Sequence, residues 1–263
     1  MKKYIFGFVL FLFLSGQAQP ISISGLMLQK EPLDATLYFD TDAFGYHYFQ
    51  KNNVFIKQKG KEIYQYKNVA LGKISYADIQ NPLKIVLFFE GFNTAVTLDN
   101  QLNETQVISF SKNNASTLVT ATGLASQNRL WVFNVLSMQL GLMDLKRGVP
   151  IYFSQPFQKN IRHYESNYNY FYWIDNDNRL YYCDLFGKIT DLGEVPEFSQ
   201  IQILDTNKIL YSFNNHLYFY SLNSKNKTEI EIEEKSFVKF KIRDQFLFIF
   251  TENEISKYQI NLP

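Results

Sequence analysis

The chain has 263 residues, of which 46% are hydrophobic, 17% aromatic and 19% charged. This composition excludes a disordered chain, because such chains combine low hydrophobicity with high net charge. Lys and Arg number 26 and Asp and Glu 25, so the formal net charge of +1 excludes long-range attraction to nucleic acid. Twelve glycines and one cysteine exclude a collagen-like chain and a disulfide scaffold.

The N-terminus has the pattern of a secretory signal peptide. Lys2 and Lys3 precede an apolar run over residues 4–14, and small residues stand at Gly16 and Ala18. The apolar run is about half as long as the roughly 20 residues that a membrane-spanning helix needs. We therefore expect cleavage after Ala18, export to the periplasm or beyond, no transmembrane segment in the mature chain, and a single domain over residues 19–263.

The rest of the chain repeats a short pattern in which an Asn opens an apolar and aromatic run. Spacings between successive examples are 40, 35, 50, 37 and 38 residues, with a mean of 40. Each run follows a second apolar run after a turn, and most of these turns are rich in Asn, Asp or Gly, which tolerate the left-handed backbone of tight hairpins. Each repeat is therefore predicted to contain a β-hairpin. The six opening residues are Asn53, Asn93, Asn128, Asn178, Asn215 and Asn253.

Several of these runs, such as 85–89 and 246–250, are apolar at every position, which predicts strands covered on both faces. A period of about 40 residues with about four short strands predicts an all-β fold, a β-propeller of six blades. The last repeat has only three predicted strands, and an unassigned strand, Ile21–Gln29, lies near the N-terminus. We expect Ile21–Gln29 to pair with Glu254–Ile260 and close the ring, because an open ring would expose an unpaired edge.

The channel of a propeller is lined by the inner strand of each blade. We expect these strands at 34–39, 73–77, 117–122, 162–166, 200–204 and 236–241. Their only acids are Asp34 and Glu165, against four Lys or Arg residues. A glycosidase needs two carboxylates that face each other across the bond they cleave. This set therefore favours a protein without catalytic residues.

The sequence predicts neither a metal site nor a cofactor. His47, His163 and His216 belong to three different repeats and never stand at metal-ligand spacing. The run 175–178 begins like a calcium loop, but Arg179 stands where an oxygen ligand is needed. We interpret this run as a hairpin turn.

The 45 aromatic residues have two predicted roles. Most, including Trp131 and Trp173, are expected to fill the space between blades. Aromatic residues in loops are typical anchors of protein interfaces. On this ground the predicted binding residues are Phe44, Tyr46, Phe92, Phe157, Tyr164 and Tyr168.

The chain resembles an uncharacterised family of exported β-propellers of Bacteroidetes. The resemblance rests on the signal peptide ending near Gln19, on residues 78–89 and on residues 97–100. The repeats lack the Trp-Asp and Gly-His pairs of WD-repeat proteins and the Asp boxes of sialidases. The resemblance implies no catalytic residues, and it implies a setting such as the secretion or gliding machinery of these bacteria.

Together these features predict a non-catalytic binding or scaffold module of the cell envelope that contacts another envelope protein through one face of the propeller. One alternative is a carbohydrate-active or other hydrolytic propeller enzyme, which requires convergent acids. A second alternative is an outer-membrane β-barrel, whose strands need about 9–11 residues, whereas these runs have about 5–7.

Overall fold

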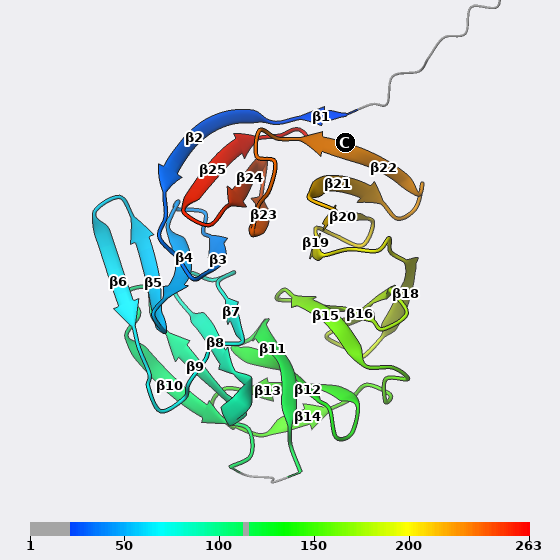
Figure 1. Cartoon of the computed structure of the whole chain (residues 1–263). Coiled ribbons are helices and arrows are strands. Elements are labelled where there is room, and N and C mark those ends of the chain that lie inside the picture. The colour runs from blue at the N-terminus through cyan, green and yellow to red at the C-terminus, as the bar shows by residue number, and fades with distance from the viewer. Residues whose placement is uncertain (1–21, 113–115) are drawn as a thin grey trace, which may run out of the picture.

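The computed structural model describes residues 22–112 and 116–263 and confirms the predicted six-bladed β-propeller. Six antiparallel sheets of four blade strands each are arranged in a ring around a channel (Figure 1). The predicted signal peptide and Ile21 lie outside the described residues. Within the described ranges the one helical element is the 3-10 turn Glu90–Phe92, so no helix there could cross a membrane.

Each blade begins with an inner strand at the channel and ends with an outer strand at the rim. Blade 1 contains β3 (Leu37–Thr41), β4 (His47–Lys51), β5 (Val54–Lys59) and β6 (Glu62–Tyr66). Blade 2 contains β7 (Tyr76–Asp78), β8 (Ile85–Phe89), β9 (Thr94–Leu98) and β10 (Glu104–Ser109). Blade 3 contains β11 (Val119–Ala125), β12 (Arg129–Asn134), β13 (Gln139–Asp144) and β14 (Pro150–Tyr152).

The other three blades complete the ring. Blade 4 contains β15 (Ile161–Ser166), β16 (Tyr170–Asp175), β17 (Arg179–Asp184) and β18 (Ile189–Glu194). Blade 5 contains β19 (Gln200–Ile203), β20 (Lys208–Phe213), β21 (His216–Ser221) and β22 (Asn226–Glu231). Blade 6 contains β23 (Lys239–Arg243), β24 (Phe246–Phe250), β25 (Glu254–Gln259) and the N-terminal strand β2 (Leu26–Pro32).

The N-terminal segment closes the ring, as predicted, but with different bounds. β2 pairs antiparallel with β25, and Leu26 lies opposite Gln259. The two residues of β1 (Ile23–Ser24) instead pair in parallel with β22 of blade 5. Gly25 lies between the two strands, where an added Cβ would be 3.0 Å from the Tyr258 ring. The N-terminal segment therefore covers the outer edges of two blades, because a short crossing at Gly25 lets it continue from one to the next.

The third repeat was predicted one strand out of phase. The run that follows Asn128 is β12, the second strand of its blade, whereas the corresponding runs form the third strand in the other five blades. The third strand of blade 3 is β13, which follows Met138. This phase error accounts for the uneven spacings of 35 and 50 residues around Asn128. Asn128 and Met138, which directly precede β12 and β13, both have positive φ, so a left-handed residue opens both strands.

The core consists of apolar clusters between neighbouring blades. Every residue of β8 and of β9 is buried, because each sheet packs against another sheet on both faces. Trp131 of blade 3 and Trp173 of blade 4 belong to one cluster, so their predicted burial is confirmed. The Trp131 ring also donates a hydrogen bond from Nε1 to the Asn167 carbonyl oxygen at 2.9 Å.

Trp131→Ala is expected to lower the free energy of unfolding by about 3–5 kcal/mol, because it leaves a large cavity between two blades. Chemical denaturation measures this change. The matched control is Leu136→Ala in an exposed turn of the same blade, which is expected to change stability by less than about 0.5 kcal/mol. Equal stability of the two variants would contradict the inter-blade packing.

Removal of residues 22–32 is expected to cost most of the stability, because it exposes the edges of β25 and β22. Thermal unfolding of the shortened chain measures the loss. A synthetic peptide of residues 22–32 added in excess is expected to raise the melting temperature again. An unchanged melting temperature after deletion would show that the ring does not depend on this segment.

Candidate functional site

Turns alternate between the two flat faces of the ring, because successive strands within each blade are antiparallel. Face A carries the turns from first to second strand, at 42–46, 79–84, 126–128, 167–169, 204–207 and 244–245, and those from third to fourth strand. Face B carries the turns from second to third strand, at 52–53, 90–93, 135–138, 176–178, 214–215 and 251–253, and the connections between blades.

The structure divides the six predicted binding residues between these faces. Phe44, Tyr46 and Tyr168 lie in face A turns. Phe92 lies in a face B turn, and Phe157 in a connection between blades on the same face. Tyr164 belongs to the inner strand β15. One surface therefore cannot include all six.

Three of the six residues are engaged by neighbouring side chains. Phe157 is buried and stacks on Trp173 with ring centroids 4.1 Å apart, so it joins blades 3 and 4. Tyr164 stacks on Phe171 at 5.7 Å, and burial holds the pKa of its hydroxyl well above the ordinary value. Tyr46 donates a hydrogen bond to Glu62. Phe44 and Phe92 are more exposed, at 65% and 55% of their surface.

Two apolar residues outside the predicted binding set are the most exposed ones in the turns of face A. Phe186 is 94% exposed and Leu83 is 69% exposed. Together with Phe44 they lie in turns of blades 1, 2 and 4.

The same type of turn fixes the backbone at all three residues. In each turn the residue two positions earlier is an Asp or Asn whose side-chain Oδ1 accepts the backbone N–H of the apolar residue, at 2.9–3.0 Å. These turns start at Asp42, Asn81 and Asp184. Such Asx turns fix the backbone without help from the core. The pattern Asp or Asn, any residue, large apolar residue, was the available sequence signal for Leu83 and Phe186.

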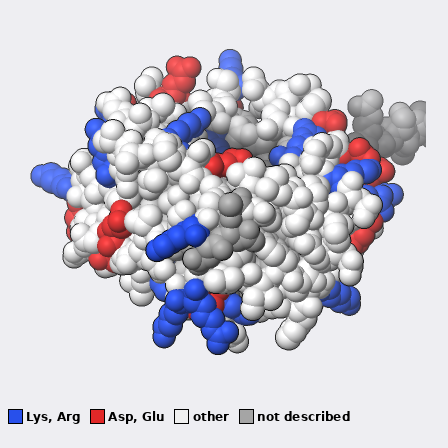
Figure 2. Space-filling view, turned by 90° about the horizontal axis from the view of Figure 1, so that it is seen from below, with Lys and Arg blue, Asp and Glu red and all other residues white. Residues whose placement is uncertain are grey.

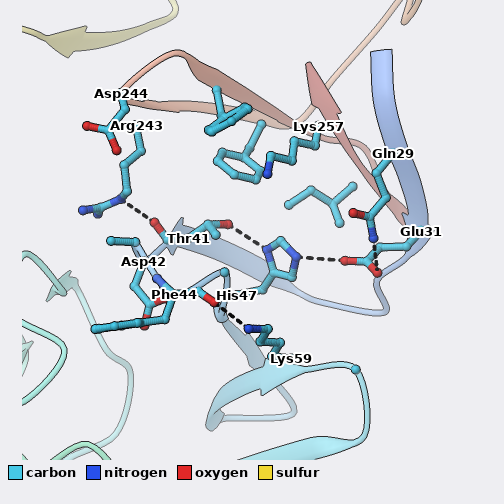
Figure 3. A pocket seen from close by; sticks show the side chains of 16 residues that line it. Gln29, Glu31, Thr41, Asp42, Phe44, His47, Lys59, Arg243, Asp244 and Lys257 are labelled. Atoms are coloured by element: carbon cyan, nitrogen blue, oxygen red, sulfur yellow. Dashed lines mark hydrogen bonds and ion pairs between the residues drawn. The ribbon is translucent and has the colours of Figure 1, made fainter. Parts of the chain in front are cut away.

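Beside Phe44 lies a cavity of about 500 Å³ between blades 6 and 1 (Figure 3). Phe246 and Phe248 of β24 contribute aromatic rings, and the Lys257 Nζ lies 3.9 Å from the centroid of the Phe246 ring. Lys59 reaches the rim and donates to the Phe44 carbonyl oxygen at 2.9 Å. Phe44 thus forms part of the wall of a cavity that has both apolar and cationic groups.

His47 connects the closing strand to blade 1 within this cavity. Its Nε2 lies 2.9 Å from Glu31 Oε1 of β2, and its Nδ1 lies 2.7 Å from Thr41 Oγ1 (Figure 3). Burial lowers the pKa of His47, Glu31 opposes that shift, and Lys257 adds to it. Both ring nitrogens are occupied and Thr41 is fully buried, so the histidine and hydroxyl hold two blades together and present no nucleophile.

The carboxylate that resembled a calcium ligand in the sequence stabilises its own turn, and Asp42 stabilises another turn in the same way. Asp175 Oδ1 accepts the backbone N–H groups of Asp177 and Arg179 at 2.9 and 3.0 Å. Asp42 does the same for Phe44 and Tyr46 at 2.9 Å. Residues 175–178 form the predicted hairpin turn between β16 and β17. Within residues 22–112 and 116–263, no three His, Cys, Asp or Glu side chains come together as metal ligands.

The predicted set of channel acids was wrong. The inner strand of blade 1 begins at Leu37, so Asp34 lies outside it and pairs with Lys51 instead. Asp40 and Asp78 line the channel together with Glu165. The error arose because β3 and β7 begin and end later in the sequence than the expected strands did, so Asp40 and Asp78 fall inside them.

Seen from the edge of the ring, charges of both signs are scattered over a mainly uncharged surface (Figure 2).

No protein-family model matches the chain, and no curated protein sequence is similar to it. Among solved structures, a DUF4221 family member from Bacteroides vulgatus is similar, with 9% identity, a TM-score of 0.59, and coverage of 92% of this chain and 99% of that one. Virginiamycin B lyase from Staphylococcus aureus has 15% identity, a TM-score of 0.55, and coverage of 84% and 78%. BamB from Moraxella catarrhalis has 9% identity, a TM-score of 0.50, and coverage of 89% and 99%. At these identities the similarity shows the propeller fold alone.

His47→Gln is expected to reduce the dependence of stability on pH. Between the lowered pKa of folded His47 and its ordinary value of 6.5, the unfolded chain binds a proton that the folded protein does not. This histidine therefore makes the wild type lose stability as pH falls through that window. Urea unfolding of both proteins from about pH 8 to about pH 5 is expected to show a smaller acid loss for the variant. Parallel curves would contradict this expectation.

Proposed function

We propose that the protein is an exported, non-catalytic binding or scaffold module of the cell envelope, and that it holds a protein partner on face A. The observation that carries this proposal is the exposure of Phe44, Leu83 and Phe186 in three turns of one face. Tyr168, in the same face, is 39% exposed and adds an aromatic ring with a polar end.

Physical reasoning favours a protein partner for these side chains. A net charge of +1 supplies little long-range attraction, so affinity has to come from local burial of apolar surface. A few large anchors usually contribute most of the energy of an interface. Anchors held by Asx turns lose little conformational entropy on binding, because their backbone is already ordered.

The envelope setting rests on the signal-peptide pattern of residues 1–18 and on the resemblance to exported propellers of Bacteroidetes. The fold similarity to the DUF4221 protein of Bacteroides vulgatus supports that resemblance at the level of architecture. Envelope assembly, secretion and gliding are the processes in which such a scaffold would act.

The test is affinity capture from a native envelope fraction, followed by direct binding of the identified partner as a purified protein. Combined Phe44→Ala, Leu83→Ala and Phe186→Ala substitutions are expected to weaken that binding about 100-fold, because they remove three anchors. All three residues are exposed, so the variant is expected to keep the melting temperature of the wild type.

The matched control substitutes Val69, Phe92 and Leu136 by Ala, which removes three exposed apolar side chains outside the proposed face A site. Loss of binding in the control but not in the face A variant would place the interface on face B and contradict the proposal. A clear hit on a glycan or small-molecule array, with no directly binding protein, would replace the scaffold function with a ligand-binding or hydrolytic one.

A further inference from the structure

Alternation along β23 directs three cationic residues toward the channel. Phe240 and Ile242 are buried in the core between blades 5 and 6. Lys239, Lys241 and Arg243 occupy the other positions and line the channel. Side chains at every second position of a strand share one face, so the three cations form a stripe along one wall.

Two of these cations have carboxylate partners. Arg243 Nη2 lies 3.1 Å from Asp40 Oδ2. Lys241 Nζ lies 3.9 Å from Glu165 Oε1, and the same oxygen lies 3.3 Å from His163 Nε2. Glu165 Oε2 also accepts the backbone N–H of Ile203 at 2.9 Å. These contacts outweigh the effect of burial and hold the pKa of Glu165 below its ordinary value, so Glu165 remains an anion.

Lys239 is the member of the stripe without such a partner. Within the described part of the chain, no carboxylate oxygen is paired with its Nζ within 4.0 Å. Burial, and then the neighbouring Lys241, lower the pKa of Lys239 to about 8. A partly buried ammonium group without a counter-ion is unfavourable, and an anion beside it would relieve that cost.

Lys239 lines a cavity of about 300 Å³ at the face B mouth of the channel. Arg162, the second residue of β15, lines the same cavity, and its guanidinium lies 4.1 Å from the centroid of the Phe198 ring. Arg162 is partly neutralised by Glu197 at 3.5 Å. The inner strands of blades 4 and 6 thus bring an excess of positive charge to one end of the channel.

Gln200 supplies a second and independent feature of this mouth. Its Nε2 donates to the Val238 carbonyl oxygen at 2.7 Å, which fixes the orientation of the amide. Its Oε1 is buried and accepts no hydrogen bond from the described residues. A ligand at Lys239 that carries a donor beside its negative charge would satisfy Gln200 as well.

We propose that the face B mouth of the channel binds a small oxyanion, the carboxylate or phosphate group of a ligand that also carries a hydroxyl donor. Lys239 supplies the direct ion pair, Lys241 and Arg162 supply the surrounding positive potential, and Gln200 accepts the hydroxyl. This site is separate from face A and does not depend on the function proposed for it.

Isothermal titration calorimetry with inorganic phosphate and with malate tests this proposal, at constant ionic strength in chloride. The wild type is expected to bind at least one probe with a stoichiometry of about one. Lys239→Met is expected to bind about 10- to 100-fold more weakly, because it removes a charge-assisted hydrogen bond. The matched control Lys235→Met removes an exposed positive charge from the connection that precedes β23 and is expected to bind as the wild type does.

The two probes distinguish a phosphate source from a carboxylate source, and binding of either supports an oxyanion site. No saturable binding of either probe, or equal binding by wild type and Lys239→Met, would overturn the proposal. Malate does not change its charge between about pH 7 and about pH 9. Its affinity for the wild type is therefore expected to fall about tenfold per pH unit above about pH 8.

Lys239→Arg keeps the charge and provides the variant for the case in which Lys239→Met does not fold. It is expected to bind malate without the fall above about pH 8, because a guanidinium remains protonated there. The other groups that face Lys239 from neighbouring strands are Glu165, His163, Arg162 and Asp40. These groups are unchanged in Lys239→Arg. Parallel pH profiles of malate affinity for the wild type and Lys239→Arg would therefore show that another group causes the pH dependence, and would overturn the role of Lys239.

Discussion

The pairing of β2 with β25 is the interaction on which the rest of the structure depends. It places the N-terminal strand β2 beside β25, the last strand of the chain, in blade 6, so that the first and last blades meet and the ring is closed. An ion pair between Lys30 and Glu254, 2.7 Å apart, and the contact of Glu31 with His47 add side-chain bonds to this closure. The cavity beside Phe44 exists because the first and last blades meet there.

Aromatic residues determine how neighbouring blades fit together. The sheets diverge from the channel toward the rim, and large flat side chains fill the widening space. Between blades 3 and 4 the rings of Phe157 and Trp173 stack, and Trp131 contacts Phe171 at 6.1 Å between centroids. The core therefore uses most of the aromatic content, and the three most exposed rings of the described residues, Phe44, Phe92 and Phe186, lie in turns.

The same strand geometry separates two kinds of surface. The turns of face A present uncharged apolar side chains on rigid Asx turns, whereas the face B mouth of the channel gathers cations from β15 and β23. Short-range burial suits the first surface, and electrostatic attraction suits the second. A propeller can keep two such functions apart, because its faces are about one strand length from each other.

The repeat spacing, the uniformly apolar strands and the unassigned N-terminal strand determined the fold, since these are local patterns that pack in one way. The burial of Trp131 and Trp173 followed from the same patterns. The phase of blade 3 did not, because a residue of positive φ precedes both β12 and β13, at Asn128 and Met138, so the Asn that opens a run does not mark the third strand in this blade.

Membership of one face was decided only by the tertiary structure. Phe44, Leu83 and Phe186 come from three different blades, and their shared face depends on the direction of each strand around the ring. The pairing of charges in the channel also required the structure, because Arg243 and Asp40 lie in the last and first blades and only ring closure brings β23 beside β3. Local sequence determines turns and strands, whereas contacts between distant blades arise only when the ring closes.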